Sequence, residues 1–141
     1  MLDGNPGCST RLLIVDDEPA IRELISQLLT GMGYHVRSAE DGMSALAEIR
    51  NQMPDIILSD LNMPGMSGFE LISVVHRSYP SIRVIAMSGA FSGEEAPSGI
   101  AADAFYQKGC GPGSLLKIIR ALPRLDRISQ DRTAVSAPAW N

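Results

Sequence analysis

The chain has 141 residues, of which 12 are basic and 16 acidic, for a net charge of −4. This length suits one domain with a sizeable core, and the scattered basic residues give no sign of a nucleic-acid surface. No apolar run approaches the ~20 residues of a membrane span, and the N-terminus holds no signal-peptide core. Because Cys8 and Cys110 lack a metal-site spacing, we expect free thiols in a cytoplasmic protein.

Short apolar runs along the chain predict five β-strands. Three runs are apolar throughout, which is typical of strands covered on both faces in a parallel sheet. These three runs are residues 12–15, 56–58 and 84–87. Residues 34–39 and 104–107 mix apolar and polar side chains, so we expect them at the sheet edges.

Two helices are predicted in the first half of the chain, where apolar residues recur at helical spacing. One begins near Pro19 and ends near Gly31, and the other follows the turn at Asp41 and Gly42. The apolar residues expected to face the core are Ile21, Leu24, Ile25, Leu28, Leu29 and Met32 in the first helix and Met43, Leu46, Ile49 and Met53 in the second.

Two further helices are predicted in the second half. Ser67 and Glu70 have the spacing of a capping box that opens a helix ending before Pro80. The last helix ends at Pro123. The apolar residues expected to face the core are Phe69, Ile72 and Val75 in the former and Leu115, Ile118, Ile119 and Leu122 in the latter.

The alternation of strands and helices predicts a doubly wound α/β domain with a parallel sheet. Right-handed crossovers bring the carboxyl ends of all strands to one edge, where such domains bind ligands. Three carboxylates, a hydroxyl and an ammonium follow or end these strands: Asp16, Asp17, Asp60, Ser88 and Lys108. We therefore expect a polar functional site at this edge.

Four stretches resemble the receiver domain of response regulators in two-component signalling, the CheY-like family. They are LLIVDDEPAIRELI (12–25), DIILSDLNMPGMSGFELI (55–72), RVIAMSGA (83–90) and ADAFYQKG (102–109). Together they frame residues 11–122. The resemblance implies a flavodoxin-like fold with five strands in the order 2-1-3-4-5, and a phosphoryl-accepting aspartate, Asp60.

The implied strand order puts Asp60 between the acid pair on one side and Ser88 and Lys108 on the other. Three carboxylates this close would repel one another and need a cation, and oxygen ligands suit Mg²⁺. We expect Asp17 and Asp60 to bind the ion directly, Asn62 to bind it through its backbone carbonyl and Asp16 to act through bound water. Lys108 would neutralise charge on the transferring group.

The same resemblance implies a conformational switch. Ser88 would bond a phosphoryl oxygen and draw the following loop inward, and Phe105 would rotate into the vacated space. The alternative for Phe105 is an ordinary aromatic residue of an edge strand.

Two features depart from the family pattern. Gly109 stands where the family usually has a proline in a cis bond, which leaves the loop after Lys108 less constrained. Pro97 and Gly99 lie between Ser88 and Lys108, where the family has a further helix, so we expect that helix to be short or irregular. Many family members dimerise through a face that includes this helix, and we therefore expect the chain to stay monomeric.

The domain expected over residues 11–123 lies between a disordered arm, 1–10, and a flexible tail, 124–141. Its expected partners are a histidine kinase or phosphotransfer protein and an unknown downstream target, with no direct binding to nucleic acid or membrane. The chain is expected to be a signalling domain and no independent enzyme, either a complete regulator or part of a longer protein.

Two alternatives remain. A degenerate receiver would act only as a docking module, an alternative to which Gly109 lends some weight. A Mg²⁺-dependent phosphatase would form a transient aspartyl phosphate, but such enzymes need a second acid two residues after the nucleophile, where Asn62 stands.

Overall fold

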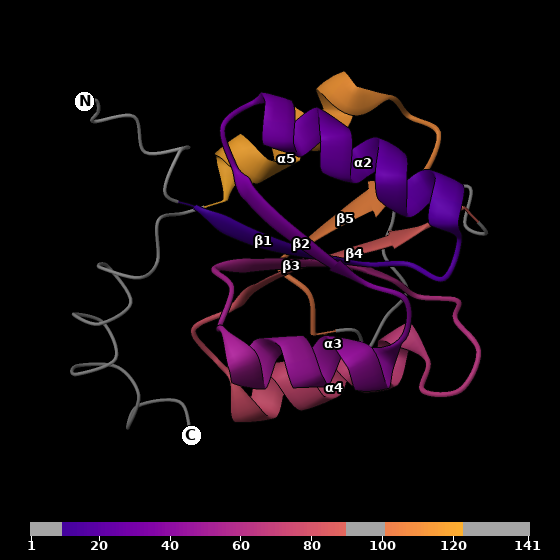
Figure 1. The fold of residues 1–141 in the computed structure, drawn as a ribbon, viewed down its shortest axis with the longest axis vertical. Helices are drawn as coiled ribbons and strands as arrows, with labels where there is room; N and C mark the ends of the chain where they lie inside the picture. Colours follow the sequence, from indigo (N-terminus) through magenta and orange to yellow (C-terminus); the bar gives the residue numbers. More distant parts are fainter. Residues whose placement is uncertain (1–9, 90–100, 123–141) are drawn as a thin grey trace.

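The computed structural model describes residues 10–89 and 101–122. Five parallel strands form one sheet in the order β2-β1-β3-β4-β5 (Figure 1), which confirms the order implied by the family resemblance. The strands are β1 (Arg11–Val15), β2 (His35–Ala39), β3 (Ile56–Asp60), β4 (Arg83–Ser88) and β5 (Ala104–Gln107). The helices are α2 (Pro19–Gly31), α3 (Gly42–Asn51), α4 (Gly68–Ser78) and α5 (Pro112–Ala121).

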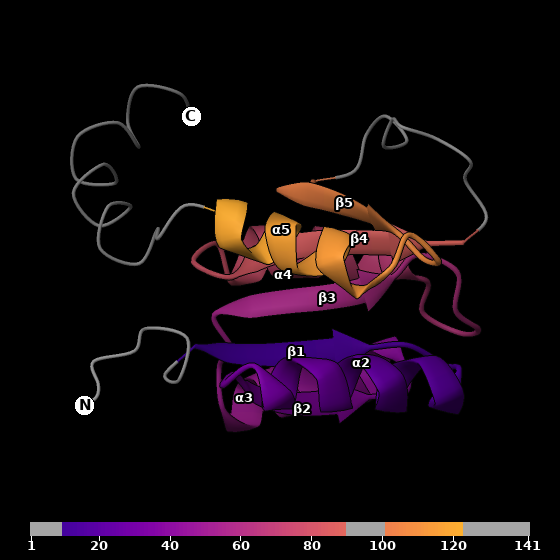
Figure 2. The same ribbon diagram turned by 90° about the horizontal axis from the view of Figure 1, so that it is seen from above.

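Helices cover both faces of the sheet, as expected for runs without alternation. Figure 1 shows α2 and α5 on one face and α3 and α4 on the other, and Figure 2 shows the strands side by side from above. Each face has its own apolar core. Leu12 and Ile14 of β1 pack in the core beneath α2 and α5, whereas Leu13 and Val15 pack in the core beneath α3 and α4. Successive residues of a strand point to opposite faces, so every strand contributes to both cores.

The predicted helix signals at α3 and α4 are present. The Ser67 hydroxyl accepts from the backbone N–H of Glu70, and the Glu70 carboxylate accepts from the backbone N–H of Ser67, which completes the capping box. Asp41 caps α3 by accepting from the N–H of Ser44. These caps satisfy backbone donors that the first turn of a helix leaves unpaired.

Several apolar residues expected in the core are exposed instead. They are Leu24, Met32, Met43, Met53 and Phe69, with between 40% and 63% of their surface accessible. Smaller or neighbouring residues take the inward positions, namely Gly42 and Ala45 in α3 and Leu71 in α4.

Close packing accounts for the glycine at the start of α3. A Cβ atom added at Gly42 would lie 2.7 Å from the sulfur of Met66 in the β3–α4 loop. The side of α3 that approaches this loop therefore has no room for a large residue.

Some expectations fall outside the described residues. They concern the arm and the tail, the stretch around Pro97 and Gly99, and the thiol of Cys8. Cys110 is described and carries an exposed free thiol. In the described ranges, no helix combines the length and the apolar character that crossing a membrane requires.

Candidate functional site

The strand register brings the polar strand ends together at one edge of the sheet. Val15 of β1 is paired with Ser59 of β3, so the next residues, Asp16 and Asp60, lie side by side. Asp60 is in turn paired with Met87 of β4, one residue before Ser88. Asp16, Asp60 and Ser88 are all buried. Buried ionised groups are costly unless other groups compensate their charge.

Alternation along the strands sorts these side chains by face. Even-numbered residues of β1, β3 and β5 pack towards α2 and α5, as do odd-numbered residues of β4. The same alternation assigns Asp16, Asp60 and Lys108 to this face of the sheet, and it assigns Ser88 and Phe105 to the face of α3 and α4. The charged groups and the two expected switch residues therefore start from opposite faces of the sheet, and Asp60 and Ser88 approach each other at its carboxyl edge, where Asn62 hydrogen-bonds to both.

Lys108 does not stay on the far side of Asp60, where the strand order alone had put it. Its ammonium nitrogen lies 2.8 Å from Oδ2 of Asp16 and 3.2 Å from Oδ2 of Asp60. A third carboxylate, that of Glu18, lies 3.4 Å away. The lysine therefore supplies much of the positive charge that the sequence argument had assigned to a metal ion alone.

The pKa values of Asp60 and Lys108 reflect this arrangement. Burial raises the pKa of Asp60 above its ordinary value, and the N–H of Asn62 and the charge of Lys108 offset only part of that rise. Burial opposes the charged form of Lys108 as well, but the carboxylates of Asp16 and Asp60 outweigh it and raise the pKa of the lysine. Lys108 is thus held as a cation.

Asp16 is fixed in place by the start of α2. Its Oδ1 accepts a 2.9 Å hydrogen bond from the backbone N–H of Glu18, and its backbone carbonyl accepts from the Arg22 guanidinium at 2.6 Å. Oδ2 of Asp16 lies 2.8 Å from the Lys108 ammonium, but it is buried and accepts no hydrogen bond from the described residues. The carboxylate of Asp16 is therefore oriented by the start of α2 and by the charge of Lys108.

Asp17 differs from its neighbour. Its half-buried carboxylate has neither an ion pair nor a hydrogen bond within residues 10–89 and 101–122. One carboxylate oxygen from each of Asp16, Asp17 and Asp60 lies within 4.8 Å of the other two. Three hard oxygen donors at this spacing suit a small divalent cation such as Mg²⁺.

Asn62 connects the acid site with the other face of the sheet. Its backbone N–H donates to Oδ1 of Asp60 at 3.1 Å, and its side-chain amide donates to the Ser88 hydroxyl at 3.0 Å. Phe105 is partly buried and packs against the core beneath α3 and α4. Ser88 is therefore linked to the Asp60 loop through one side chain.

The backbone around Asp60 is tightly packed against the start of α4. A Cβ atom added at Gly68 would lie 1.9 Å from the Asp60 carbonyl oxygen, and the Gly68 N–H donates to the Leu61 carbonyl at 3.2 Å. Only glycine allows this approach. Gly68 thus helps to set the position of the Asp60 backbone.

The loop that carries Lys108 is held at both ends. The Lys108 N–H donates to the Ser88 carbonyl at 3.1 Å, and the Tyr106 hydroxyl donates to the Gly111 carbonyl at 3.1 Å. Gly109 has φ of 95° and Gly111 has φ of 93°, in a region that favours glycine. No peptide bond among the described residues is cis. Glycine thus replaces the family's proline with a different backbone conformation.

Sequence reasoning did not identify three of these contributors. It passed over Glu18 and Arg22, and it considered Asn62 only through its backbone. Glu18 directly follows the acid pair, and this adjacency was the available signal. The bonds of Arg22 and of the Asn62 amide depend on loop geometry that a single sequence does not reveal.

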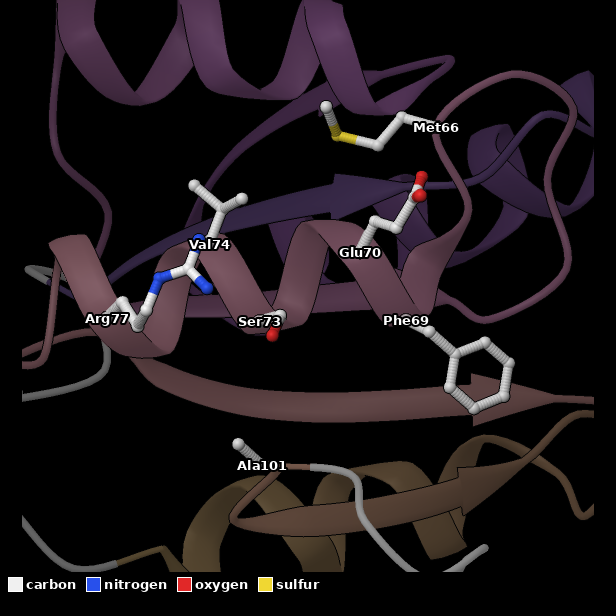
Figure 3. Close-up of a pocket in the computed structure, with 7 residues that line it drawn as sticks. All are labelled: Met66, Phe69, Glu70, Ser73, Val74, Arg77 and Ala101. Carbon is white, nitrogen blue, oxygen red and sulfur yellow. The ribbon is translucent and has the colours of Figure 1, made fainter.

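A separate pocket of about 580 Å³ lies along the outer side of α4, away from the acid cluster. Figure 3 shows side chains of α4, with Met66 and Ala101, around it. None of Asp16, Asp17, Asp60 or Lys108 lines it. The chemistry of this chain is therefore concentrated at the strand ends rather than in this pocket.

Comparisons with known proteins agree with this geometry. The family model of the response regulator receiver domain matches residues 12–120. The chain is similar to the probable transcriptional regulatory protein TcrX of Mycobacterium tuberculosis (strain ATCC 25618 / H37Rv), with 32% identity over 124 residues. The match covers 86% of this chain and 52% of TcrX, so the chain spans about half the length of this relative.

Two solved structures contain the response regulator TrrA of Thermotoga maritima. One is a complex with Mg²⁺ and BeF, with 30% identity and a TM-score of 0.73. The other is a complex with the histidine kinase ThkA, with 30% identity and a TM-score of 0.72. Each match covers 79% of this chain and 97% of TrrA.

Proposed function

Since the chain belongs to the response regulator receiver family of two-component signalling, we propose that it accepts a phosphoryl group on Asp60 and switches conformation to regulate a partner. The observation that carries this proposal is the convergence of Lys108 with the buried carboxylates of Asp16 and Asp60. Such a cluster is costly to bury and is typical of a functional site.

The transfer would rest on positioning and electrostatics. One oxygen of Asp60 would form a bond to phosphorus while the bond from phosphorus to the donor breaks, and the donor group would leave with the electron pair. Lys108 would stabilise the negative charge of the transferring group. Asp60 must be ionised to attack, and Lys108 favours the ionised form.

Asp17 and Asp60 would hold Mg²⁺ directly, Asn62 would hold it through its backbone carbonyl, and Asp16 would act through bound water. The Asp17 carboxylate, with neither an ion pair nor a hydrogen bond in the described ranges, supports direct binding. When bound, the ion supplies positive charge against the phosphoryl oxygens. The Mg²⁺-containing complex of TrrA supports the choice of metal.

The switch would pass through Ser88 and Phe105. Ser88 now accepts from the Asn62 amide and would donate its hydroxyl to a phosphoryl oxygen. Phe105 lies on the same face of the sheet and would rotate into the space that the moving loop leaves.

The proposed phosphoryl donor is a histidine kinase or a phosphotransfer protein, in line with the TrrA–ThkA complex. The downstream target is an unidentified partner, and we propose no direct binding of nucleic acid by this domain. We propose residues 11–123 as the receiver domain and a monomer as its state. Asn62, two residues after Asp60, favours a phosphoacceptor over a phosphatase, so the domain would catalyse only its own phosphorylation and dephosphorylation.

Acetyl phosphate tests this function. The protein is incubated with acetyl phosphate and Mg²⁺, and its intact mass and the released phosphate are followed over time. A long-lived adduct of one phosphoryl group supports the phosphoacceptor. Rapid phosphate release without an adduct would indicate a phosphatase, and no reaction would indicate a docking module.

A further inference from the structure

Lys108 contacts a carboxylate that belongs to neither the acid pair nor the phosphoacceptor. Glu18 is the N-cap residue, directly before α2, with Oε1 3.4 Å from the Lys108 nitrogen. An ammonium group has three N–H donors, and three carboxylates surround this one, at 2.8, 3.2 and 3.4 Å. The contact with Glu18 is a hydrogen bond, whereas Oδ2 of Asp16 is buried, has no hydrogen-bond partner in the part of the chain that the structure describes and pairs with the lysine by charge. Before transfer, Lys108 is therefore surrounded by carboxylates, and Glu18 holds one of its N–H groups.

The three carboxylates differ in what it costs to release them. The side chains of Asp16 and Asp60 are 0% and 4% exposed, so either would lose its partner without gaining water. The Glu18 side chain is 61% exposed and can be hydrated once it leaves the lysine. Its contact is also the longest of the three. Glu18 is thus the partner that Lys108 gives up at least cost.

The main chain of Glu18 is anchored independently of this contact. Its N–H donates to Asp16 at 2.9 Å, and its carbonyl accepts from the Arg22 N–H at 3.0 Å. Releasing the lysine therefore requires only a rotation of the Glu18 side chain. The start of α2 and the position of Asp16 need not change.

We propose that Glu18 is a positioning residue that holds one N–H of Lys108 before transfer and releases it to the phosphoryl group on Asp60. This inference rests on the proposed function. With acetyl phosphate, Asp60 gains the bond to phosphorus and acetate leaves with the electron pair of the broken P–O bond. Lys108 keeps its protons and exchanges one carboxylate acceptor, Glu18, for a phosphoryl oxygen.

Three variants separate this contact from a general effect of charge. Glu18→Gln removes the charge and keeps the length, whereas Glu18→Asp keeps the charge and shortens the reach. Glu40→Gln removes one acid from the same sheet edge, since Glu40 directly follows β2 and is exposed, and no contact joins it to Lys108. Each protein is labelled with acetyl phosphate and Mg²⁺, and the phosphoprotein is followed by intact mass.

We expect both Glu18 variants to form the phosphoprotein about two- to fivefold faster than the wild type, the range that an exposed ion pair supplies. Glu40→Gln should match the wild type. After the donor is removed, all four proteins should lose the phosphoryl group at the same rate, because Glu18 no longer contacts Lys108 at that stage.

A spectroscopic measurement tests the exchange directly. The ¹⁵N resonance of the Lys108 ammonium should differ between the wild type and Glu18→Gln in the resting protein. It should coincide in the two proteins once Mg²⁺ and beryllofluoride are bound. A purely structural role of Glu18 would leave the difference in both states.

Each opposing outcome has a distinct meaning. Equal labelling rates in all four proteins would overturn the release of Glu18 and leave the proposed function standing. If both Gln variants label faster and Glu18→Asp labels like the wild type, the effect is one of net charge. This outcome would also overturn the proposed release of Glu18. If no protein is labelled, the proposed function is overturned, and the role of Glu18 with it.

Discussion

Lys108 reaches from the end of β5 to the end of β1, where its ammonium lies 2.8 Å from Oδ2 of Asp16, a residue without solvent exposure. It also contacts Asp60, so a single cation compensates two buried carboxylates. The stability of the resting domain therefore depends on a residue that the proposed function uses in transfer.

Lys108→Met should lower the free energy of unfolding by about 3 kcal/mol in EDTA, the lower end of the range for breaking a buried ion pair. Mg²⁺ should restore part of this loss, because it supplies positive charge to the same acids. Urea unfolding with EDTA and with Mg²⁺ measures both effects. Lys117→Met, at an exposed position of α5, is the control, and an equally small loss in both variants would contradict the prediction.

Asp60→Asn should abolish labelling by acetyl phosphate and leave the fold intact. The substitution removes the nucleophile and keeps its shape, and the carbonyl of the new side chain can still accept from the N–H of Asn62. Intact mass and circular dichroism check the two parts. An Asp60→Asn protein that labels like the parent would exclude Asp60 as the acceptor.

Mg²⁺ should raise the thermal stability of the wild type, since an ion that binds only the folded state stabilises it by about 2.7 kcal/mol at a hundred times its Kd. Asp17→Ala should lose most of this gain, whereas Glu40→Ala, at an exposed site on the same edge, should keep it. Thermal unfolding over a Mg²⁺ series provides the measurement. An unchanged response in Asp17→Ala would place the ion elsewhere.

The pKa of Asp60 predicts how stability depends on pH. Burial raises this pKa above 3.8, so the folded state keeps the proton at pH values where the unfolded chain has lost it. The free energy of unfolding should therefore fall as pH rises from about 3.8 through the raised pKa, relative to Asp60→Asn. Urea unfolding of both proteins in EDTA across this interval tests the sign, and a constant or rising difference would contradict it.

Gly68→Ala should destabilise the domain by more than ~1 kcal/mol and slow the labelling of Asp60, because its Cβ would lie 1.9 Å from the Asp60 carbonyl oxygen. Gly113→Ala is the matched control, since a Cβ there meets nothing within 4 Å. The control should gain up to ~1 kcal/mol from helix propensity and label normally. Similar effects of the two substitutions would show that the close approach of Gly68 has no role.

The sequence was sufficient to predict the layout of the sheet. Apolar runs without alternation correctly marked the central strands, and mixed runs marked the edges, because burial on both faces leaves little room for polar residues. The helix boundaries followed from Pro19 and from the capping box of Ser67. These signals are local, so a single sequence carries them.

The inward faces of the helices were harder to predict. Size and apolar character placed Leu24, Met43 and Phe69 in the core, but all three are exposed. The close approach of Met66 leaves room only for a small residue at Gly42 of α3, and it joins residues distant in sequence. Spacing within one helix cannot reveal such a contact.

The candidate site was predicted as a set of residues but not as a network. Strand ends and the family motif brought the acids, Ser88 and Lys108 to one edge. The reach of Lys108 to Asp16 follows from the alternation of side chains, which had not been applied across the sheet. The contact with Glu18 depends on the backbone conformation at the start of α2.

The glycine at position 109 limits how this domain can be engineered by consensus with its family. A consensus design would introduce Gly109→Pro, since the family usually carries proline after its lysine. The backbone at Gly109 has φ of 95°, whereas a proline ring fixes φ near −65°. Transplanting the common residue would force the loop to refold and would shift Lys108 with it. Average sequences of a family are thus a poor guide at this position.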